Sequence, residues 1–354
     1  MALYFTPNMT AARAPTPAMQ ILPICYNPSM RYHDPLYGQL EIEDHVLLDL
    51  MQTQAMQRLR GVLQHGITAL IGITQPVTRF DHSLGVMLLV RRLGGSLEEQ
   101  IAALLHDVSH TAFSHVIDYV VDGHDRQSYH EEWKEARLLA SDVPEVLARH
   151  GYDWRDFLRE EDYMLLEQPS PRLCADRLDY FLRDSCDLGL STLDQARHAL
   201  DHLVVHDGRI GVDEIEVARW LAHTYIAADR ASWANFREVG LYEVTARAIK
   251  AAMQIGAISE DDFWGTDEQL WRKLHAIDYA EIQEQLALIS PATRFEWDEV
   301  NPTFRVSTKL RTVDPDVLVG GRFQPLSTLD LDFARYRAEY VRSNSGQWPM
   351  RVLA

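Results

Sequence analysis

The sequence predicts a mainly helical protein with small β-hairpins and a C-terminal region that contains further strands. From about residue 44 to residue 255, apolar side chains recur at three- and four-residue spacings, the period of helices with one buried face. Two short segments, 31–45 and 201–214, alternate and contain turn residues, so they predict hairpins. Residues 293–319 have no helical period, which indicates strands or extended chain. We therefore expect a helical core with small β elements attached to it.

Each element is predicted from a local pattern. The first hairpin is indicated by the turn residues Asp34-Pro35 and Gly38, and the second by Asp207-Gly208. The apolar spacing predicts core helices over 44–50, 54–64, 82–93, 97–106, 114–121, 128–139, 172–187, 214–235 and 238–254. Two more helical stretches are expected after residue 256, and a last helix over 328–342.

Three divisions of the chain are predicted. Residues 1–30 contain five prolines and no convincing period, so we expect a loosely attached N-terminal lead-in. The helical pattern places the core in 31–255. Residues 256–354 are expected to form an accessory region of helices and strands, as a cap or an assembly surface. No internal repeat is found in the sequence.

Composition and charge narrow the class of protein. The 46% hydrophobic and 24% charged residues are ordinary for a soluble globular protein. The formal net charge of −18 repels a nucleic-acid backbone, which argues against DNA or RNA as a partner but leaves room for a local basic pocket. The longest apolar runs, such as 86–90, are too short to span a bilayer, so no membrane partner is expected. Three cysteines without a C-x-x-C pair fit a reducing compartment, and we expect a cytoplasmic protein.

Four residues have the character of a metal site. His82, the adjacent pair His106-Asp107, and Asp176 lie in three separate predicted helices. Two imidazoles and two carboxylates suit a borderline divalent ion such as Mn, Fe, Co, Ni or Zn, with coordination positions left for water and substrate. Any one of these residues alone is more often an ordinary helix-end or surface residue. The doublet at the end of an apolar helix makes a metal site the better interpretation of all four.

The order of these residues resembles a known family, the HD-domain metal-dependent phosphohydrolases. The resemblance extends to the deoxynucleoside triphosphate triphosphohydrolase branch, which includes bacterial dGTPases and the human SAM-and-HD-domain enzyme. It covers roughly residues 33–190 and lies in four motifs: DPLYGQLEIEDHVLLDLMQTQAMQRLRGVLQHG (34–66), TRFDHSLGV (78–86), HDVSHTAFSHVID (106–118) and ADRLDYFLRDSCDLGL (175–190). Several ordered matches are far more specific than one His-Asp doublet. The resemblance implies an HD-domain helical core.

The resemblance also implies roles for individual residues. The metal ligands would be His82, His106, Asp107 and Asp176. Asp118 and His130 would assist departure of the 5′ oxygen, and His110 would act with them while facing the phosphates. A carboxylate such as Asp118 raises the pKa of a neighbouring histidine, so His130 can be protonated near neutral pH and act as a general acid. The implied contacts to phosphate and sugar are Gln64, Arg79, His115, Arg177, Tyr180 and Asp184.

The residues themselves give partial support to these roles. Asp176, Tyr180 and Asp184 are spaced four residues apart and would share one helix face. Without the resemblance, Asp118 and His130 would be taken for surface residues and Tyr180 for a core aromatic.

The sequence also departs from the family. Ser109 and Ala112 replace a glycine and a proline of the family, which changes backbone freedom but no donor. The segment expected to complete the nucleotide pocket is 231–244, where only Val239-Gly240 aligns well. This departure affects the side of the site that would recognise base and sugar.

We therefore predict a metal-dependent phosphohydrolase that acts on a nucleotide. The favoured reaction is hydrolysis of a deoxynucleoside triphosphate at the α-phosphate to nucleoside and triphosphate, with one divalent transition metal per site and Mg as a further candidate at the substrate phosphates. One alternative is an HD-type nucleotidase or phosphodiesterase with two metals bridged near Asp107. Another is a non-catalytic nucleotide-binding HD protein. The resemblance also implies a homo-oligomer.

Overall fold

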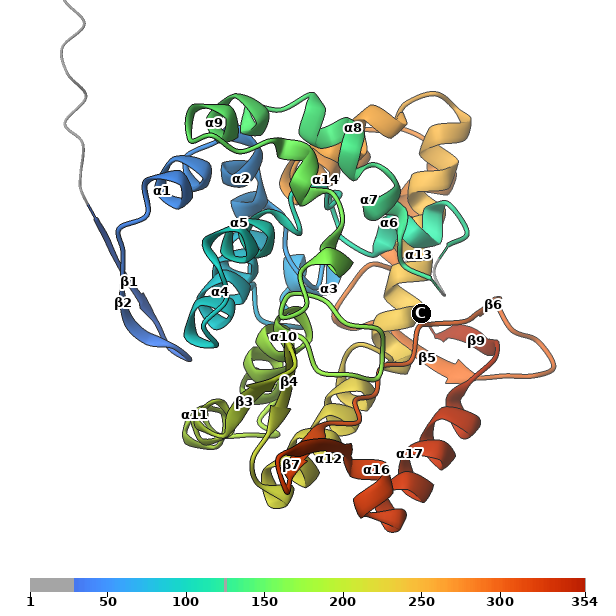
Figure 1. Ribbon diagram of the computed structural model, residues 1–354. Coiled ribbons are helices and arrows are strands. Elements are labelled where there is room, and N and C mark those ends of the chain that lie inside the picture. Colours follow the sequence, from blue (N-terminus) through green and yellow to red (C-terminus); the bar gives the residue numbers. More distant parts are fainter. Residues whose placement is uncertain (1–28, 124–125, 354) are drawn as a thin grey trace, which may run out of the picture.

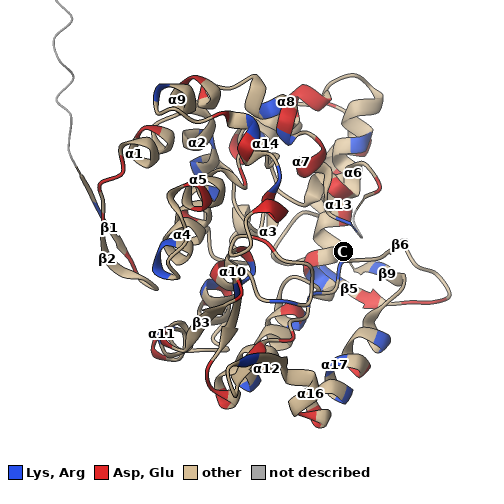
Figure 2. Ribbon diagram, viewed as in Figure 1, with Lys and Arg blue, Asp and Glu red and all other residues tan. Residues whose placement is uncertain are grey.

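Helices dominate the structure, and the predicted mainly helical fold class is confirmed (Figure 1). The computed structural model describes residues 29–123 and 126–353. The predicted N-terminal lead-in therefore lies outside the described residues, apart from its last two positions. No described helix is long and apolar enough to cross a membrane. Figure 2 shows acidic and basic residues interspersed over many elements, so the net charge of −18 is not confined to one face of the fold.

The described chain contains α-helices, short 3-10 helices and strands. The α-helices are α1 (His45–Met51), α2 (Gln54–Arg58), α3 (Ile67–Leu70), α4 (Arg79–Arg92), α5 (Leu97–Leu105), α6 (Val116–Val120), α7 (Tyr129–Glu132), α8 (Lys134–Leu139), α9 (Val143–Arg149), α10 (Ala175–Asp187), α11 (Leu193–Asp201), α12 (Ile215–Ala231), α13 (Phe236–Gln254), α14 (Asp267–His275), α15 (Ala280–Ala287), α16 (Leu326–Leu329) and α17 (Leu331–Asn344). The 3-10 helices are η1 (Leu59–Gly61), η2 (Trp154–Phe157), η3 (Glu160–Asp162) and η4 (Glu260–Trp264). The strands are β1 (Met30–Asp34), β2 (Gly38–Ile42), β3 (Leu203–His206), β4 (Arg209–Val212), β5 (Arg294–Trp297), β6 (Phe304–Val306), β7 (Asp316–Val319), β8 (Arg322–Pro325) and β9 (Trp348–Leu353).

Local capping explains several differences from the predicted boundaries. α4 begins three residues before the predicted start at 82, because Thr78 accepts a hydrogen bond from the backbone N–H of Asp81 and fixes the first turn. The predicted helix 128–139 is wrong as one unit, since it breaks at Trp133 into α7 and α8. The helices α9 and α11 were not predicted. α11 carries a capping box at Thr192, a start signal that the apolar spacing alone does not capture.

The C-terminal chain returns to pair with earlier elements. Both predicted hairpins are confirmed as β1–β2 and β3–β4. β7 then pairs in parallel with β4, through Val212 and Val317, so the second hairpin becomes half of a four-stranded sheet in the order β3-β4-β7-β8. A separate three-stranded sheet, β5-β9-β6, packs near α13 (Figure 1). The extended chain predicted in 293–319 therefore belongs to two different sheets.

Two hydrophobic clusters stabilise the described fold. One is centred on α4, α5, α10 and α12, and the other on α6, α13, α14 and α15. Each cluster takes side chains from both sides of the predicted division at 255/256: Val317 and Phe333 join the first, and Phe304 and Met350 join the second. The division of the chain at this point stays a prediction.

Candidate active site

Three helices bring the four predicted metal ligands together. His82 lies in the first turns of α4, His106 ends α5 and is followed by Asp107, and Asp176 lies in the first turn of α10. His82 Nε2 lies 2.9 Å from Asp176 Oδ1 and 3.3 Å from His106 Nε2. His106 Nε2 lies 3.5 Å from Asp107 Oδ1 and 3.6 Å from Asp176 Oδ1. The four groups therefore face one small volume, although they come from sequence positions almost a hundred residues apart.

The outer nitrogen of each histidine is fixed by an acceptor. His82 Nδ1 lies 2.8 Å from Asp179 Oδ2, and His106 Nδ1 lies 2.7 Å from the carbonyl oxygen of Ala103. An acceptor on this side places the ring proton at Nδ1, so each Nε2 is left with a lone pair for a metal. The donor set fits a divalent transition metal, because two such imidazole nitrogens converge with two carboxylates.

Asp179 is held against His82 by a close helix contact. Its carboxylate also accepts a hydrogen bond from the Tyr37 hydroxyl (2.7 Å) and pairs with Arg183 (3.0 Å). On α4, a Cβ at Gly85 would lie 2.1 Å from Asp179 Oδ1, so only glycine allows α10 to approach this closely. Asp179 was not among the predicted site residues, although it is three positions after Asp176 on the same helix.

The ionised carboxylates of this cluster need a positive charge beside them. Burial alone would lower the pKa of His82, but hydrogen bonds to Asp176 and Asp179 raise that pKa to about 10. Burial would raise the pKa of the Asp107 carboxyl, yet the neighbouring Arg79 guanidinium and His106 hold it well below its usual range. The carboxylates are therefore ionised, and protons on the histidines supply the positive charge that a metal ion would supply.

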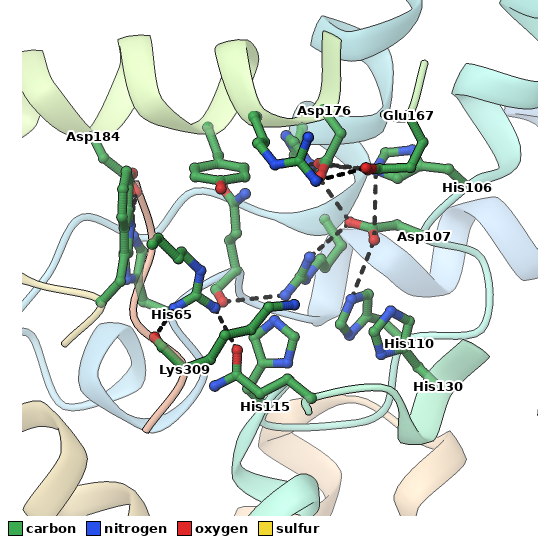
Figure 3. Close-up of a pocket in the computed structure, with 18 of the residues that line it drawn as sticks. His65, His106, Asp107, His110, His115, His130, Glu167, Asp176, Asp184 and Lys309 are labelled. Atoms are coloured by element: carbon green, nitrogen blue, oxygen red, sulfur yellow. Dashed lines mark hydrogen bonds and ion pairs between the residues drawn. The ribbon is translucent and has the colours of Figure 1, made fainter. Parts of the chain in front are cut away.

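The remaining predicted histidines come from the loop after α5, which carries His110 and His115, and from α7, which carries His130. His110 Nε2 lies 3.2 Å from Asp107 Oδ1, and its ring stacks on that of His130 with the centroids 3.7 Å apart. His115 Nδ1 lies 3.1 Å from Asp118 Oδ2. Figure 3 shows His110, His130 and His115 gathered on one side of Asp107. Asp107, His110 and His130 form a second group of ligand atoms within 4.8 Å of one another.

This loop is held by two side chains outside the predicted set, one half-buried and one buried. Arg58 donates to the carbonyl oxygens of Val108 (3.0 Å) and His110 (2.7 Å). Asp267, at the start of α14, accepts from the backbone N–H groups of Phe113 (2.8 Å) and Leu63 (2.9 Å). Phe113 has φ of 59°, in the left-handed region that costs energy for a non-glycine residue. The C-terminal region thus stabilises a strained loop beside the metal ligands.

The surroundings of His130 oppose its predicted protonation near neutral pH. Burial, together with the nearby His110 and His115, lowers the pKa of His130 well below its usual range against the opposing effect of Asp118. Burial and the Arg79 guanidinium likewise lower the pKa of His110 to about 3. A nearby negative charge, such as a phosphate, would raise both pKa values. The role of His130 as a general acid stays a prediction.

One cavity of about 430 Å³ collects the predicted site residues. All four predicted metal ligands line it, and so do the predicted residues Gln64, Arg79, His110, His115, His130, Arg177, Tyr180 and Asp184. Asp118 is not among the lining residues and lies behind His115. The structure therefore brings together all but one of the predicted side chains at the cavity surface, while their individual roles stay predictions.

The two predicted arginines are engaged with protein groups. Arg79 donates to Asp107 Oδ2 (2.8 Å), to Ser114 Oγ (3.1 Å) and to the carbonyl oxygen of Gln64 (3.4 Å). Arg177 pairs with Glu167 (2.6 Å) and donates to the carbonyl oxygens of Gln168 (2.6 Å) and Arg172 (3.0 Å). Arg79 therefore orders the metal ligands as well as facing the cavity. Arg177 is held by the chain that precedes α10.

Polar and aromatic side chains form another part of the cavity wall. Asp184 accepts from Trp233 Nε1 (2.7 Å) and lies 3.1 Å from His65 Nε2. The Tyr242 hydroxyl donates to the carbonyl oxygen of His65 (3.0 Å), and the Tyr180 ring meets the Trp233 ring edge to face at 4.9 Å. Trp233 and Tyr242 belong to the segment 231–244, the one expected to complete the nucleotide pocket.

Several lining residues were missed by the sequence prediction. These are His65, Gln127, Glu131, Glu160, Glu167, Ser170, Tyr225, Trp233, Tyr242 and the segment 309–312. The neighbourhood of Gln64 would have indicated His65, whereas nothing in the local pattern of 309–312 predicts a place in the cavity. The latter segment comes from the C-terminal region, to which no role in the site was assigned.

Comparison with known proteins gives the class. A protein-family model described as HD domain matches residues 79–184. YdhJ of Bacillus subtilis is 40% identical over 295 residues, which cover 83% of this chain and 90% of that protein. The metal-dependent phosphohydrolase cns2 of Cordyceps militaris is 36% identical over 326 residues, covering 90% of this chain and 94% of that protein. The chain belongs to the HD-domain metal-dependent phosphohydrolases.

More distant relatives share the fold, and the name of one of them includes a substrate. A crystal structure of a hypothetical protein from Aquifex aeolicus has a TM-score of 0.65 at 19% identity, over 92% of this chain and 95% of that one. A phosphohydrolase from Bacteroides thetaiotaomicron also has a TM-score of 0.65, at 16% identity over 92% of this chain and 98% of that one. The deoxynucleoside triphosphate triphosphohydrolase SAMHD1 homolog of Dictyostelium discoideum is 24% identical, over 73% of this chain and 57% of that protein.

Proposed function

We propose that this enzyme hydrolyses nucleotide phosphate esters, with deoxynucleoside triphosphates as the first candidate substrates. The observation that carries the proposal is the composition of one cavity. It holds the ligands His82, His106, Asp107 and Asp176 beside three histidines, together with an aromatic and polar wall. Metal donors and the N–H groups of histidines suit a phosphate, and aromatic rings suit a base or sugar. The distant triphosphohydrolase relative supports the choice of first substrate.

A divalent ion bound by these four ligands would supply Lewis-acid chemistry, polarising a phosphoryl oxygen and acidifying a water molecule. The chain's own residues then divide the remaining work. His115 is the better candidate for the proton donor to the leaving oxygen, because Asp118 Oδ2 lies 3.1 Å from its Nδ1 and would stabilise the imidazolium form. That form would donate from Nε2 once the negative charge of the substrate offsets the burial that lowers the pKa of His115. His130 stacks on His110, and we assign this pair to the phosphate oxygens.

A second candidate substrate class, a nucleotide with a short phosphate group, is favoured by the acidic residues of the cavity. Glu131, Glu160 and Glu167 line it, and Glu167 occupies Arg177. Carboxylates on the wall repel a polyphosphate chain more strongly than a single phosphate group. The group of Asp107, His110 and His130 would also allow a second metal, as in the predicted nucleotidase or phosphodiesterase alternative.

The test is a substrate panel with product analysis. Metal-loaded protein is incubated with deoxy- and ribonucleoside mono-, di- and triphosphates, and the products are separated by anion-exchange chromatography. Inorganic triphosphate from a deoxynucleoside triphosphate would support the first candidate. Inorganic phosphate released only from monophosphates would replace it with the second. An unchanged turnover in Asp107→Ala would contradict the metal-dependent reaction for both candidates and favour the non-catalytic alternative.

A further inference from the structure

A short segment of the C-terminal region enters the cavity. All four residues of the segment 309–312, here called the strap, line the cavity, although the nearest predicted ligand in sequence, Asp176, lies far earlier in the chain. Figure 3 shows the Lys309 side chain extending into the cavity toward His115. The strap thus forms a wall that faces the histidines and the metal ligands.

Buried contacts fix the strap in this position. The backbone N–H of Arg311 donates to Asp229 Oδ2 on α12 (2.8 Å), and the Tyr340 hydroxyl of α17 donates to the same oxygen (2.8 Å). Asp229 is fully buried. Thr312 Oγ1 accepts from Arg337 Nε on α17 (3.0 Å). Because these anchors hold the backbone, the two basic side chains are presented to the cavity without large conformational freedom.

The positive charge of the strap is only partly balanced by the protein. The Arg311 guanidinium donates to two neutral acceptors, the amide oxygen of Gln127 (2.5 Å) and the carbonyl oxygen of Lys309 (3.3 Å), and forms no ion pair with a carboxylate among the described residues. Lys309 likewise has no contacting carboxylate within the described chain, although Glu131 and Glu167 act on its charge from a distance. Lys309 is exposed and Arg311 is half-buried, so both keep a positive charge at the cavity that an anion there would neutralise.

The histidines of the cavity lie beside the strap. Burial first, and then Arg79, Arg311 and Lys309, hold the pKa of His115 well below its usual range, so the charges of the strap act on this ring. The strap lines the same cavity as the stacked pair of His110 and His130. An anion bound between the strap and these histidines would therefore contact both.

We propose that Lys309 and Arg311 bind the phosphate group of the substrate, so that the C-terminal strap completes the active site. This inference rests on the proposed function, since it assigns to the strap a part of the same substrate. The ligand class is an inorganic or esterified phosphate bound between the strap and the histidines.

The experiment measures anion binding separately from turnover. Inorganic phosphate and tripolyphosphate are titrated into the full-length, metal-loaded protein by calorimetry at constant ionic strength. Lys309→Met and Arg311→Met should each weaken phosphate binding roughly tenfold or more, as expected for loss of a hydrogen bond to a charged group. Arg311→Lys should retain more affinity than Arg311→Met. Metal content and thermal midpoint are measured for every variant, so a folding defect is recognised.

Arg305→Met is the matched control. Arg305 is exposed on β6, donates to the carbonyl oxygen of Glu299 and does not line the cavity. Its replacement by Met therefore removes the same charge from the same region of the chain without changing the cavity. Unchanged phosphate affinity in both strap variants would overturn the inference, as would an equal loss in the control or no binding by the parent protein. Strap-dependent phosphate binding without nucleotide hydrolysis would refute the proposed function alone. Hydrolysis with a KM that is independent of the strap would refute the inference alone.

Discussion

The metal-ligand side of the cavity and its substrate-facing wall are built in different ways. The predicted ligands lie between residues 82 and 176, in the first turns of α4 and α10 and directly after α5. The opposite wall is assembled from residues 64 and 65, α10, the chain from α12 to α13, and the strap, so its residues are spread from 64 to 312. A metal imposes donor type and geometry, so its ligands form a compact sequence pattern. A substrate wall requires only shape and charge, which distant segments can supply.

The largest effect is expected from Asp176→Ala. Removing this ligand should lower the activity by about 10³-fold or more, because a metal supplies several kcal/mol of transition-state stabilisation and each 1.36 kcal/mol is a factor of ten in rate. Bound metal and turnover are measured together. Asp187→Ala, an exposed carboxylate at the end of the same helix, is the control and should keep both. Full activity in Asp176→Ala would show that Asp176 is not a metal ligand that the reaction needs.

A smaller loss is expected from Asp179→Asn. The amide keeps the size of the side chain but weakens the acceptor that fixes His82, so metal affinity should fall roughly 10- to 100-fold. Competition with a chelator measures the affinity, and saturating metal should restore most of the turnover. If metal affinity were unchanged, the bond between Asp179 and His82 would serve helix packing rather than the ligand.

These two sides of the site also differ in how far the sequence predicted them. The ordered motifs identified His82, His106, Asp107 and Asp176, because metal ligation allows few residue types at few positions. The strap was not predicted, since Lys309 and Arg311 resemble any surface pair until the return of the chain through β7 brings them to the cavity. Local patterns predicted the long helices and the two hairpins. The larger sheets could not be predicted in this way, because they depend on pairing between strands that are distant in the sequence.

Asp267→Ala tests the link between the two sides. The change leaves the backbone N–H groups of Phe113 and Leu63 without their acceptor, and each unsatisfied buried group costs about 1–3 kcal/mol. We expect a clear fall in the free energy of unfolding, measured in urea, and a lower kcat because the loop that carries His110 and His115 loosens. Asp261→Ala, an exposed residue of η4 nearby, should change neither quantity. A stable variant with normal kcat would show that the strained loop does not depend on Asp267 for its conformation.

The smallest effect is expected in the pH dependence that His65 gives to the substrate-facing wall. Burial alone would lower the pKa of His65, but Asp184 and Glu238 raise that pKa to about 9. A raised histidine pKa adds stability that is fully present below pH 6.5 and is lost as the pH rises through 9. His65→Gln should therefore destabilise the protein by up to about 3 kcal/mol near pH 6.5 and by progressively less toward pH 10.

Urea unfolding of the parent protein and of His65→Gln at several pH values measures the difference between their free energies of unfolding. Taking this difference cancels the contribution from the titration of the other groups. The His65→Gln change keeps a polar side chain at the position, so a cost that does not vary with pH reports packing and hydrogen bonding alone. That outcome would mean that Asp184 faces a neutral imidazole. Its carboxylate would then carry an uncompensated charge beside Trp233, and the wall would be a site for a cationic or hydrogen-bond-donating group of the substrate instead of a closed ion pair.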